Sequence, residues 1–183
     1  MITRFPPCRS EINGMDPTDR FVFLDLDGVV KVPREIDGGW GNHAVFHPQR
    51  LQLLRSLVTT VGAKIVITSD LRENGYEWIV KNLHPYITKD MLAWEWATPK
   101  LSGHIDRHEE VWEWMADHSI SFEHLRFAIL EDTRLHFEGA PWWMKERVVW
   151  CNNRYGFIQP LFQQAVGLFV NPVRRYQGDQ GEH

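Results

Sequence analysis

The sequence predicts an α/β protein, a three-layer α/β/α domain built on a Rossmann-like parallel sheet. Short apolar runs bounded by turn residues recur along the chain, as expected for strands that are buried on both faces of such a sheet. Segments with helical spacing of apolar residues alternate with these runs, which implies right-handed crossover connections. The 183 residues are enough for one domain with a full core.

Composition limits the classes of partner. The net charge of -4 gives no overall attraction to nucleic acid or to an anionic membrane, so such binding would need a local patch. No apolar run reaches the roughly 20 residues of a membrane span, and the N-terminus lacks the apolar block of a signal peptide. Cys8 and Cys151 cannot form a disulfide framework, which favours a reducing compartment. We therefore expect a cytoplasmic protein with no membrane partner.

The first strand follows an extension, residues 1–19, that has no periodicity and is predicted to be flexible. In the stretch 21–30, four apolar residues lead into Asp25, Leu26, Asp27 and Gly28. Open α/β sheets bind their ligands at the carboxyl ends of their strands. Asp25 and Asp27 point to opposite sides unless the chain bends, and Gly28 supplies the freedom for that bend. The alternative is an Asp-x-Asp-Gly turn that only closes a strand.

The next segments supply a second polar strand end. Residues 31–40 are rich in Gly and Pro and are predicted to form a loop over the site, and a helix follows from Pro48 to Gly62. The apolar residues 64–67 form a second buried strand that ends in Thr68 and Ser69, with Arg72 three residues later. Hydroxyls and a guanidinium suit a phosphate, although the same residues could simply cap the next helix.

The second half of the chain repeats the pattern. We expect a helix at 75–83, an ambiguous strand or turn within 87–96, a loop at 98–103, and a helix at 107–118 that turns Val111, Trp112 and Met115 inward and Glu110 outward. A third strand, 126–132, ends in Glu131 and Asp132. A strand at 148–151, a helix at 160–168 and a disordered tail at 171–183 complete the chain, with the domain proper at 20–170.

Three strand ends thus carry polar groups, and their motifs resemble those of the haloacid dehalogenase superfamily of aspartate-nucleophile phosphatases. Residues 24–30 match its first motif, 65–69 resemble its second, and 130–132 resemble its acidic fourth motif. The third motif is a single basic residue near a helix start, for which Lys100 and Arg107 are both eligible. The likeness is closest to small capless members, which include domains of RNA-repair proteins and uncharacterised phage and bacterial proteins.

The resemblance implies a Mg²⁺-dependent phosphatase. Asp25 would be the nucleophile and Asp27 the general acid and base. Thr68 or Ser69 would bind a phosphate oxygen, and Lys100 or Arg107 would offset charge. The metal would be held by Asp25, by Asp132 and by the backbone carbonyl of Asp27, with Glu131 as an alternative ligand. Gly28 and Arg72 would contact the substrate.

The spacing of the motifs leaves no room for an inserted cap, because residues 31–63 and 70–99 are each accounted for by a helix and its connections. An open site admits a large substrate, and by analogy we expect a nucleotide or polynucleotide phosphate. The alternatives are a small-metabolite phosphatase and a non-catalytic module that binds phosphate or metal. The oligomeric state stays open.

Two other residue sets lead to weaker hypotheses. His104 and His108 are spaced for one helix face, but no third ligand has a telling spacing, so a zinc site is not expected. Four tryptophans could stack bases, although burial is expected for most of them: Trp94, Trp96, Trp142 and Trp143.

Overall fold

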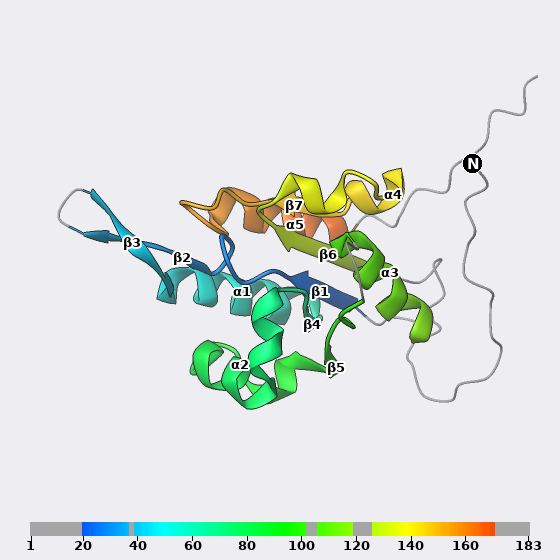
Figure 1. Ribbon diagram of the computed structural model, residues 1–183, viewed down its shortest axis with the longest axis horizontal. Coiled ribbons are helices and arrows are strands. Elements are labelled where there is room, and N and C mark those ends of the chain that lie inside the picture. Colours follow the sequence, from blue (N-terminus) through cyan, green and yellow to red (C-terminus); the bar gives the residue numbers. More distant parts are fainter. Residues whose placement is uncertain (1–19, 37–38, 102–105, 119–125, 171–183) are drawn as a thin grey trace, which may run out of the picture.

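A computed structural model describes residues 20–36, 39–101, 106–118 and 126–170. Five parallel strands form the central sheet in the order β5-β4-β1-β6-β7, with β1 in the middle (Figure 1). Their bounds are β1 Arg20–Leu24, β4 Lys64–Ile67, β5 Leu92–Ala97, β6 Arg126–Glu131 and β7 Val148–Trp150. The predicted α/β class is confirmed.

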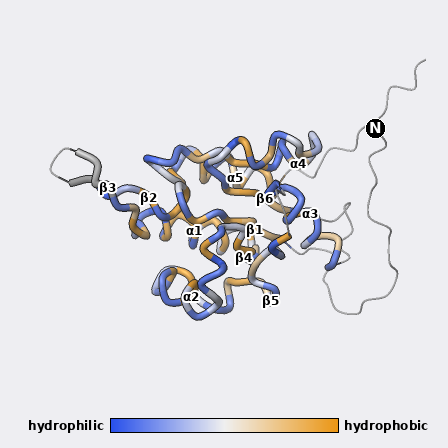
Figure 2. Tube along the Cα trace, in the orientation of Figure 1, coloured by the Kyte–Doolittle hydropathy of each residue, from blue (hydrophilic) through white to orange (hydrophobic). Residues whose placement is uncertain are grey.

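Helices cover both faces of the sheet, because alternate residues of each strand point to opposite sides. Val22 and Leu24 belong to a core cluster shared with α1, α2 and α5, whereas Phe21 and Phe23 pack with α3 and α4. Figure 2 shows hydrophobic residues gathered in the middle of the molecule, along these contacts. The helix bounds are α1 Pro48–Val61, α2 Tyr76–Leu83, α3 Arg107–Asp117, α4 Trp142–Lys145 and α5 Gln159–Val170.

Local signals explain several of these elements. Pro48 opens α1, and Gly62 closes it with a left-handed φ of 65°. The ambiguous segment 87–96 contains a 3₁₀ turn, η2 (Lys89–Met91), followed by β5. Two more 3₁₀ turns directly follow strands, η1 (Asp70–Asn74) after β4 and η3 (Arg134–Phe137) after β6.

The loop predicted after the first strand is wrong, since this segment forms a two-stranded antiparallel hairpin of β2 (Lys31–Ile36) and β3 (Gly39–Phe46). Pro and Gly are poor in the interior of a sheet, but an isolated ribbon has two edges, where a missing N–H is tolerated. The hairpin extends away from the body of the molecule (Figure 1).

Helix α3 also differs from expectation. Trp114 is buried instead of Trp112, which is only partly buried, and Glu110 is buried rather than outward. The expectation that most of the four tryptophans are buried is wrong, because Trp143 is buried and Trp96 is partly buried, whereas Trp94 and Trp142 are exposed.

No cap domain is present among the described residues: the hairpin alone lies between β1 and α1, and η1, α2 and η2 lie between β4 and β5. The predicted extension at 1–19 and tail at 171–183 lie outside the described residues. Within the described ranges, no helix has the length and apolar character to cross a membrane.

Candidate active site

The register of the sheet brings three polar residues side by side. Leu24, the last residue of β1, pairs with Ile67 of β4 and with Leu130 of β6. The residues that come next along each strand are Asp25, Thr68 and Glu131, all of which are buried. The Asp25 N–H donates to the Leu130 carbonyl at 3.0 Å, and the Thr68 N–H donates to the Leu24 carbonyl at 2.9 Å, so the pairing continues into the site.

Three carboxylates converge at this edge. Asp25, Glu131 and Asp132 each offer an oxygen, and these oxygens all lie within 4.8 Å of one another. Glu131 is fully buried, and its Oε1 accepts from the backbone N–H groups of Asp132 (3.2 Å) and Thr133 (3.1 Å) and lies 3.3 Å from Nδ1 of His136. Its Oε2 is buried and has no hydrogen-bond partner among the described residues.

Such a cluster fits a hard divalent cation. A buried carboxylate oxygen without a partner is unfavourable unless something compensates it, and oxygen ligands are what Mg²⁺ prefers. The His136 side chain was missed in the sequence, because only the 3₁₀ turn η3 brings it back toward Glu131.

The electrostatics of Asp25 reflect this crowding. Burial, and then the negative charge of Glu131, raise the pKa of Asp25 to about 7, although the Arg107 guanidinium and a hydrogen bond with Ser69 act in the opposite direction. Burial is also the largest cause of a raised pKa at Asp132. A cation bound between these groups would favour their charged forms.

Of the two basic candidates, the structure brings Arg107 and not Lys100 to the carboxylates. Arg107 is the first residue of α3; its Nη1 lies 3.3 Å from Oδ1 of Asp25 and donates to the carbonyl of Thr68. Lys100 instead forms an exposed ion pair with Glu73.

Arg72 lies beside Arg107 but is held by protein groups. Its Nη1 donates to the Thr68 carbonyl at 2.5 Å, and its Nη2 donates to Oε1 of Glu110 at 2.7 Å, with both side chains buried. Sequence reasoning missed Glu110. Its position three residues after Arg107, hence on the same helix face, is the signal that could have found it.

Both hydroxyl candidates lie next to Asp25. The Thr68 hydroxyl is buried and has no hydrogen-bond partner among the described residues. The Ser69 hydroxyl accepts from the Leu71 N–H at 3.4 Å and so caps η1, while it also contacts Asp25. The capping alternative therefore holds for Ser69.

Asp27 and Gly28 form a bend after β1. Gly28 has a left-handed φ of 69°, and a Cβ at this position would lie 2.0 Å from Oδ2 of Asp132. A glycine is required both by the backbone conformation and by this close approach. The Asp27 side chain is half exposed and accepts from Nζ of Lys31 at 2.7 Å. Lys31 was missed, because residues 31–40 were predicted to be a loop.

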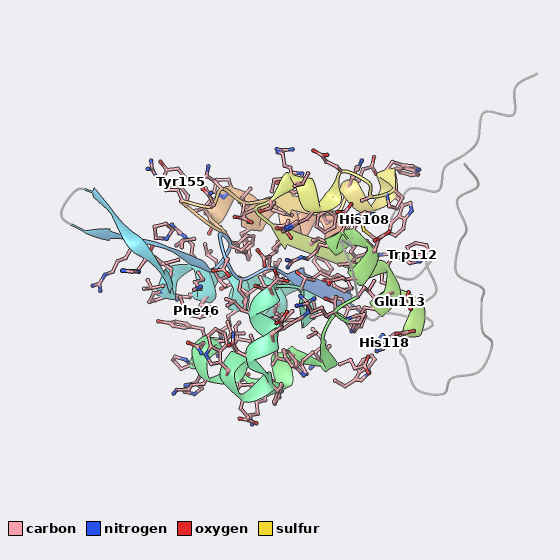
Figure 3. The ribbon with its side chains drawn as sticks, viewed as in Figure 1. Phe46, His108, Trp112, Glu113, His118 and Tyr155 are labelled. Carbon is pink, nitrogen blue, oxygen red and sulfur yellow. The ribbon has the colours of Figure 1, made fainter. Side chains whose placement is uncertain are left out.

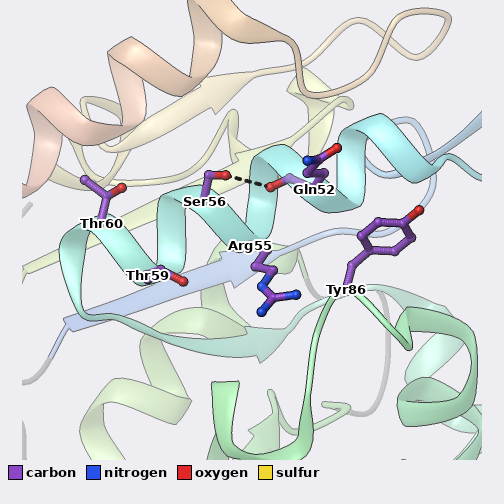
Figure 4. Close-up of a pocket in the computed structure, with 6 residues that line it drawn as sticks. All are labelled: Gln52, Arg55, Ser56, Thr59, Thr60 and Tyr86. Carbon is purple, nitrogen blue, oxygen red and sulfur yellow. Dashed lines mark hydrogen bonds between the residues drawn. The ribbon is translucent and has the colours of Figure 1, made fainter.

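Two features lie apart from this cluster. His104 is outside the described residues, and Nδ1 of His108 lies 3.3 Å from the carbonyl of His136. A groove of about 510 Å³ lies along the outer face of α1 and contains none of the carboxylates (Figure 4). It is lined by Gln52, Arg55, Ser56, Thr59, Thr60 and Tyr86.

Comparison with known proteins identifies the family of the chain. No curated protein and no solved structure matches the chain. The family model described as the HAD domain in Swiss Army Knife RNA repair proteins matches residues 21–162, a range that contains the carboxylates, both hydroxyls and Arg107. The chain therefore belongs to the haloacid dehalogenase superfamily, as a phosphatase-type domain of the kind found in Swiss Army Knife RNA repair proteins.

Proposed function

We propose that the protein is a Mg²⁺-dependent phosphomonoester hydrolase that uses Asp25 as its nucleophile and acts on a nucleotide or polynucleotide phosphate. The observation that carries this proposal is the convergence of Asp25, Glu131 and Asp132 beside Arg107, with one buried oxygen of Glu131 lacking a partner. Three carboxylates this close repel one another, and a buried oxygen without a partner is unfavourable, so a cation bound between them would compensate both effects.

In the proposed reaction, a carboxylate oxygen of Asp25 attacks phosphorus and the bond to the leaving oxygen breaks. Asp27 gives that oxygen a proton, and it later takes a proton from the water that attacks the aspartyl-phosphate and frees Asp25. The half-exposed position of Asp27, fixed by Lys31, keeps it accessible to a leaving group from solvent.

The remaining residues would hold the phosphoryl group. The Arg107 guanidinium faces Asp25 and would offset the charge on the phosphoryl oxygens, while Thr68 and Ser69 offer hydroxyl donors on the opposite side of the nucleophile from Glu131. Asp25, Asp132 and Glu131 would hold Mg²⁺, which neutralises negative charge so that an anionic nucleophile can approach an anionic phosphate.

The proposed substrate class is supported by two observations. The described residues contain no cap over the carboxyl ends of the strands, so a phosphate on a large molecule can reach Asp25. The matching family model describes the HAD domain in RNA repair proteins, which favours a phosphate on a nucleic acid as the substrate.

Phosphate release from a panel of substrates tests the proposal. The panel contains 3′- and 5′-phosphorylated oligonucleotides, free nucleotides and sugar phosphates, each with and without Mg²⁺, beside Asp25→Asn. We expect metal-dependent release that is abolished in the variant and fastest with nucleotide or oligonucleotide phosphates. Faster release from sugar phosphates would favour the small-metabolite phosphatase. Binding of Mg²⁺ and phosphate with no release from any substrate would favour the non-catalytic module.

A further inference from the structure

A positively charged side chain is held over an aromatic ring beside the carboxylate cluster. The guanidinium carbon of Arg134 lies 4.9 Å from the centre of the Trp150 ring, and Trp150 packs edge-on against Phe137. Arg134 is exposed, and among the described residues no carboxylate lies within ion-pairing distance of it. A cation–π contact fixes the guanidinium without neutralising its charge.

The position of this pair follows from the topology. Arg134 begins η3, two residues after Asp132, and Trp150 is the last residue of β7, where it pairs with Glu131. The pair therefore lies at the same edge of the sheet as Asp25, on the side of β6 and β7. Arg134 is exposed as well as held over the indole ring, and bases stack on guanidinium planes.

The loop that follows β7 extends this surface. It contains the exposed residues Arg154 and Tyr155, and it is fastened to the turn after β1 because the Phe157 N–H donates to the Val29 carbonyl at 2.8 Å. Gly156 lies against the same carbonyl, where a Cβ would approach to 2.4 Å. Figure 3 shows Tyr155 at the end of the molecule from which the hairpin extends.

On the opposite side of the site, the charged side chains are paired with one another, and Asp70 lies 3.7 Å from Arg72 and 3.6 Å from Arg107. Asp70 and Glu77 have side chains that are each 79% exposed, and the cations nearby are already paired, Lys100 with Glu73 and Lys89 with Glu77. An anionic polymer whose terminal phosphate reaches Asp25 therefore meets neutralised pairs over β4 and the uncompensated charge of Arg134 on the side of β6 and β7.

We propose that Arg134 and Trp150, with the loop 152–156 beside them, form a subsite for the nucleotide next to the reacting phosphate of a single-stranded polynucleotide. This inference rests on the proposed function and specifies its substrate. Arg134 binds the adjacent phosphodiester or stacks under the adjacent base, and Tyr155 offers a second aromatic face. Stacking surfaces suit bases, which a phosphoprotein lacks.

Binding measured without turnover tests the subsite. In the Asp25→Asn background, fluorescence anisotropy measures the binding of a fluorescein-labelled ten-nucleotide RNA with a terminal phosphate. Competition against this RNA measures the affinity for a nucleoside monophosphate. We expect Arg134→Ala to weaken RNA binding about tenfold more than mononucleotide binding. The slope of log affinity against log salt concentration should fall by about 0.7, as expected for one lost phosphate contact.

Two further variants sharpen the result. Arg134→Lys keeps the charge but not the planar group, so the salt slope should persist while part of the affinity is lost. Arg55→Ala removes an exposed arginine from the outer face of α1 and should change RNA binding less than twofold.

The subsite would be overturned if Arg134→Ala lowered the affinities for RNA and for the mononucleotide equally, or lowered neither. It would also be overturned if a phosphopeptide displaced the RNA at equal concentration. Because the assay needs no hydrolysis, its outcome is separable from that of the phosphatase proposal. An RNA-selective loss in a protein that releases no phosphate would support the subsite and refute the enzyme.

Discussion

Replacing Asp25 by Asn should make the metal-free protein more stable at neutral and alkaline pH. Burial and the neighbouring Glu131 raise the pKa of Asp25 from 3.8 to about 7. Between these two pH values the folded state holds a proton that the unfolded chain has lost, so stability falls as pH rises through that window. Asn is neutral, and its side-chain oxygen can still accept from Arg107.

The magnitude follows from the size of this shift. About three pKa units at 1.36 kcal/mol each set an upper value of about 4 kcal/mol at pH 8, and relaxation around the charge reduces it to about 2–4 kcal/mol. At pH 4 the difference should fall below about 1 kcal/mol, since Asp25 is then protonated in the folded state and still partly protonated in the unfolded chain. The raised pKa of Asp132 changes stability in the same direction but is common to both proteins.

Urea unfolding in EDTA at pH 4 and pH 8 measures the effect. Asp117→Asn, at an exposed position near the end of α3, is the matched control and should change stability by less than about 0.5 kcal/mol. With excess Mg²⁺ at pH 8, the wild type should gain more stability than Asp25→Asn, because only the wild type has the full ligand set. An Asp25→Asn protein that is no more stable than the wild type at pH 8 in EDTA would refute the reasoning.

Three further outcomes follow from the site. Arg107→Met should lower kcat at least 100-fold because its guanidinium faces Asp25, whereas Lys100→Met, at an exposed ion pair, should stay within about threefold; equal losses in phosphate-release assays would contradict this assignment. Mg²⁺ affinity measured by calorimetry should fall about tenfold per pH unit below pH 7, since Asp25 must lose its proton to bind; a flat profile from pH 5 to 7 would argue against Asp25 as a ligand. Glu110→Leu should destabilise the fold by about 3 kcal/mol in urea unfolding, because among the described residues the buried Arg72 then keeps only the exposed Asp70 at 3.7 Å as an ionic partner, and an unchanged midpoint would show that this contact is sufficient.

The sequence was sufficient to predict the sheet and the polar strand ends. Continuous apolar runs are a strong signal for buried parallel strands, and the carboxyl ends of such strands must share one edge. Asp25, Thr68 and Glu131 therefore lie together without any further assumption. The bend at Gly28 was also predictable from the residue type, although its contact with Asp132 was not.

The features that were missed depend on tertiary contacts. Glu110 is hydrophilic, but a buried arginine from another element makes its burial favourable. The choice of Arg107 over Lys100 depends on where α3 begins, and boundaries are the least certain part of a sequence-based assignment. The hairpin at 31–46 was hidden by Pro33 and three glycines, which weaken a strand only where it must pair on both sides.

The central position of β1 has a consequence for synthesis of the chain on the ribosome. This strand is nearly all apolar and emerges before both of its partners, β4 and β6, and the Arg107 contact with Asp25 joins residues 82 positions apart. Long-range pairing delays folding because the intervening chain must first be ordered. Until β6 has left the ribosome, the hydrophobic strand β1 has one edge without a pairing strand. Chaperones would be expected to shield such a segment. The proposed phosphatase activity could begin only after β6 has docked, so activity would report that the central strands β4, β1 and β6 have come together.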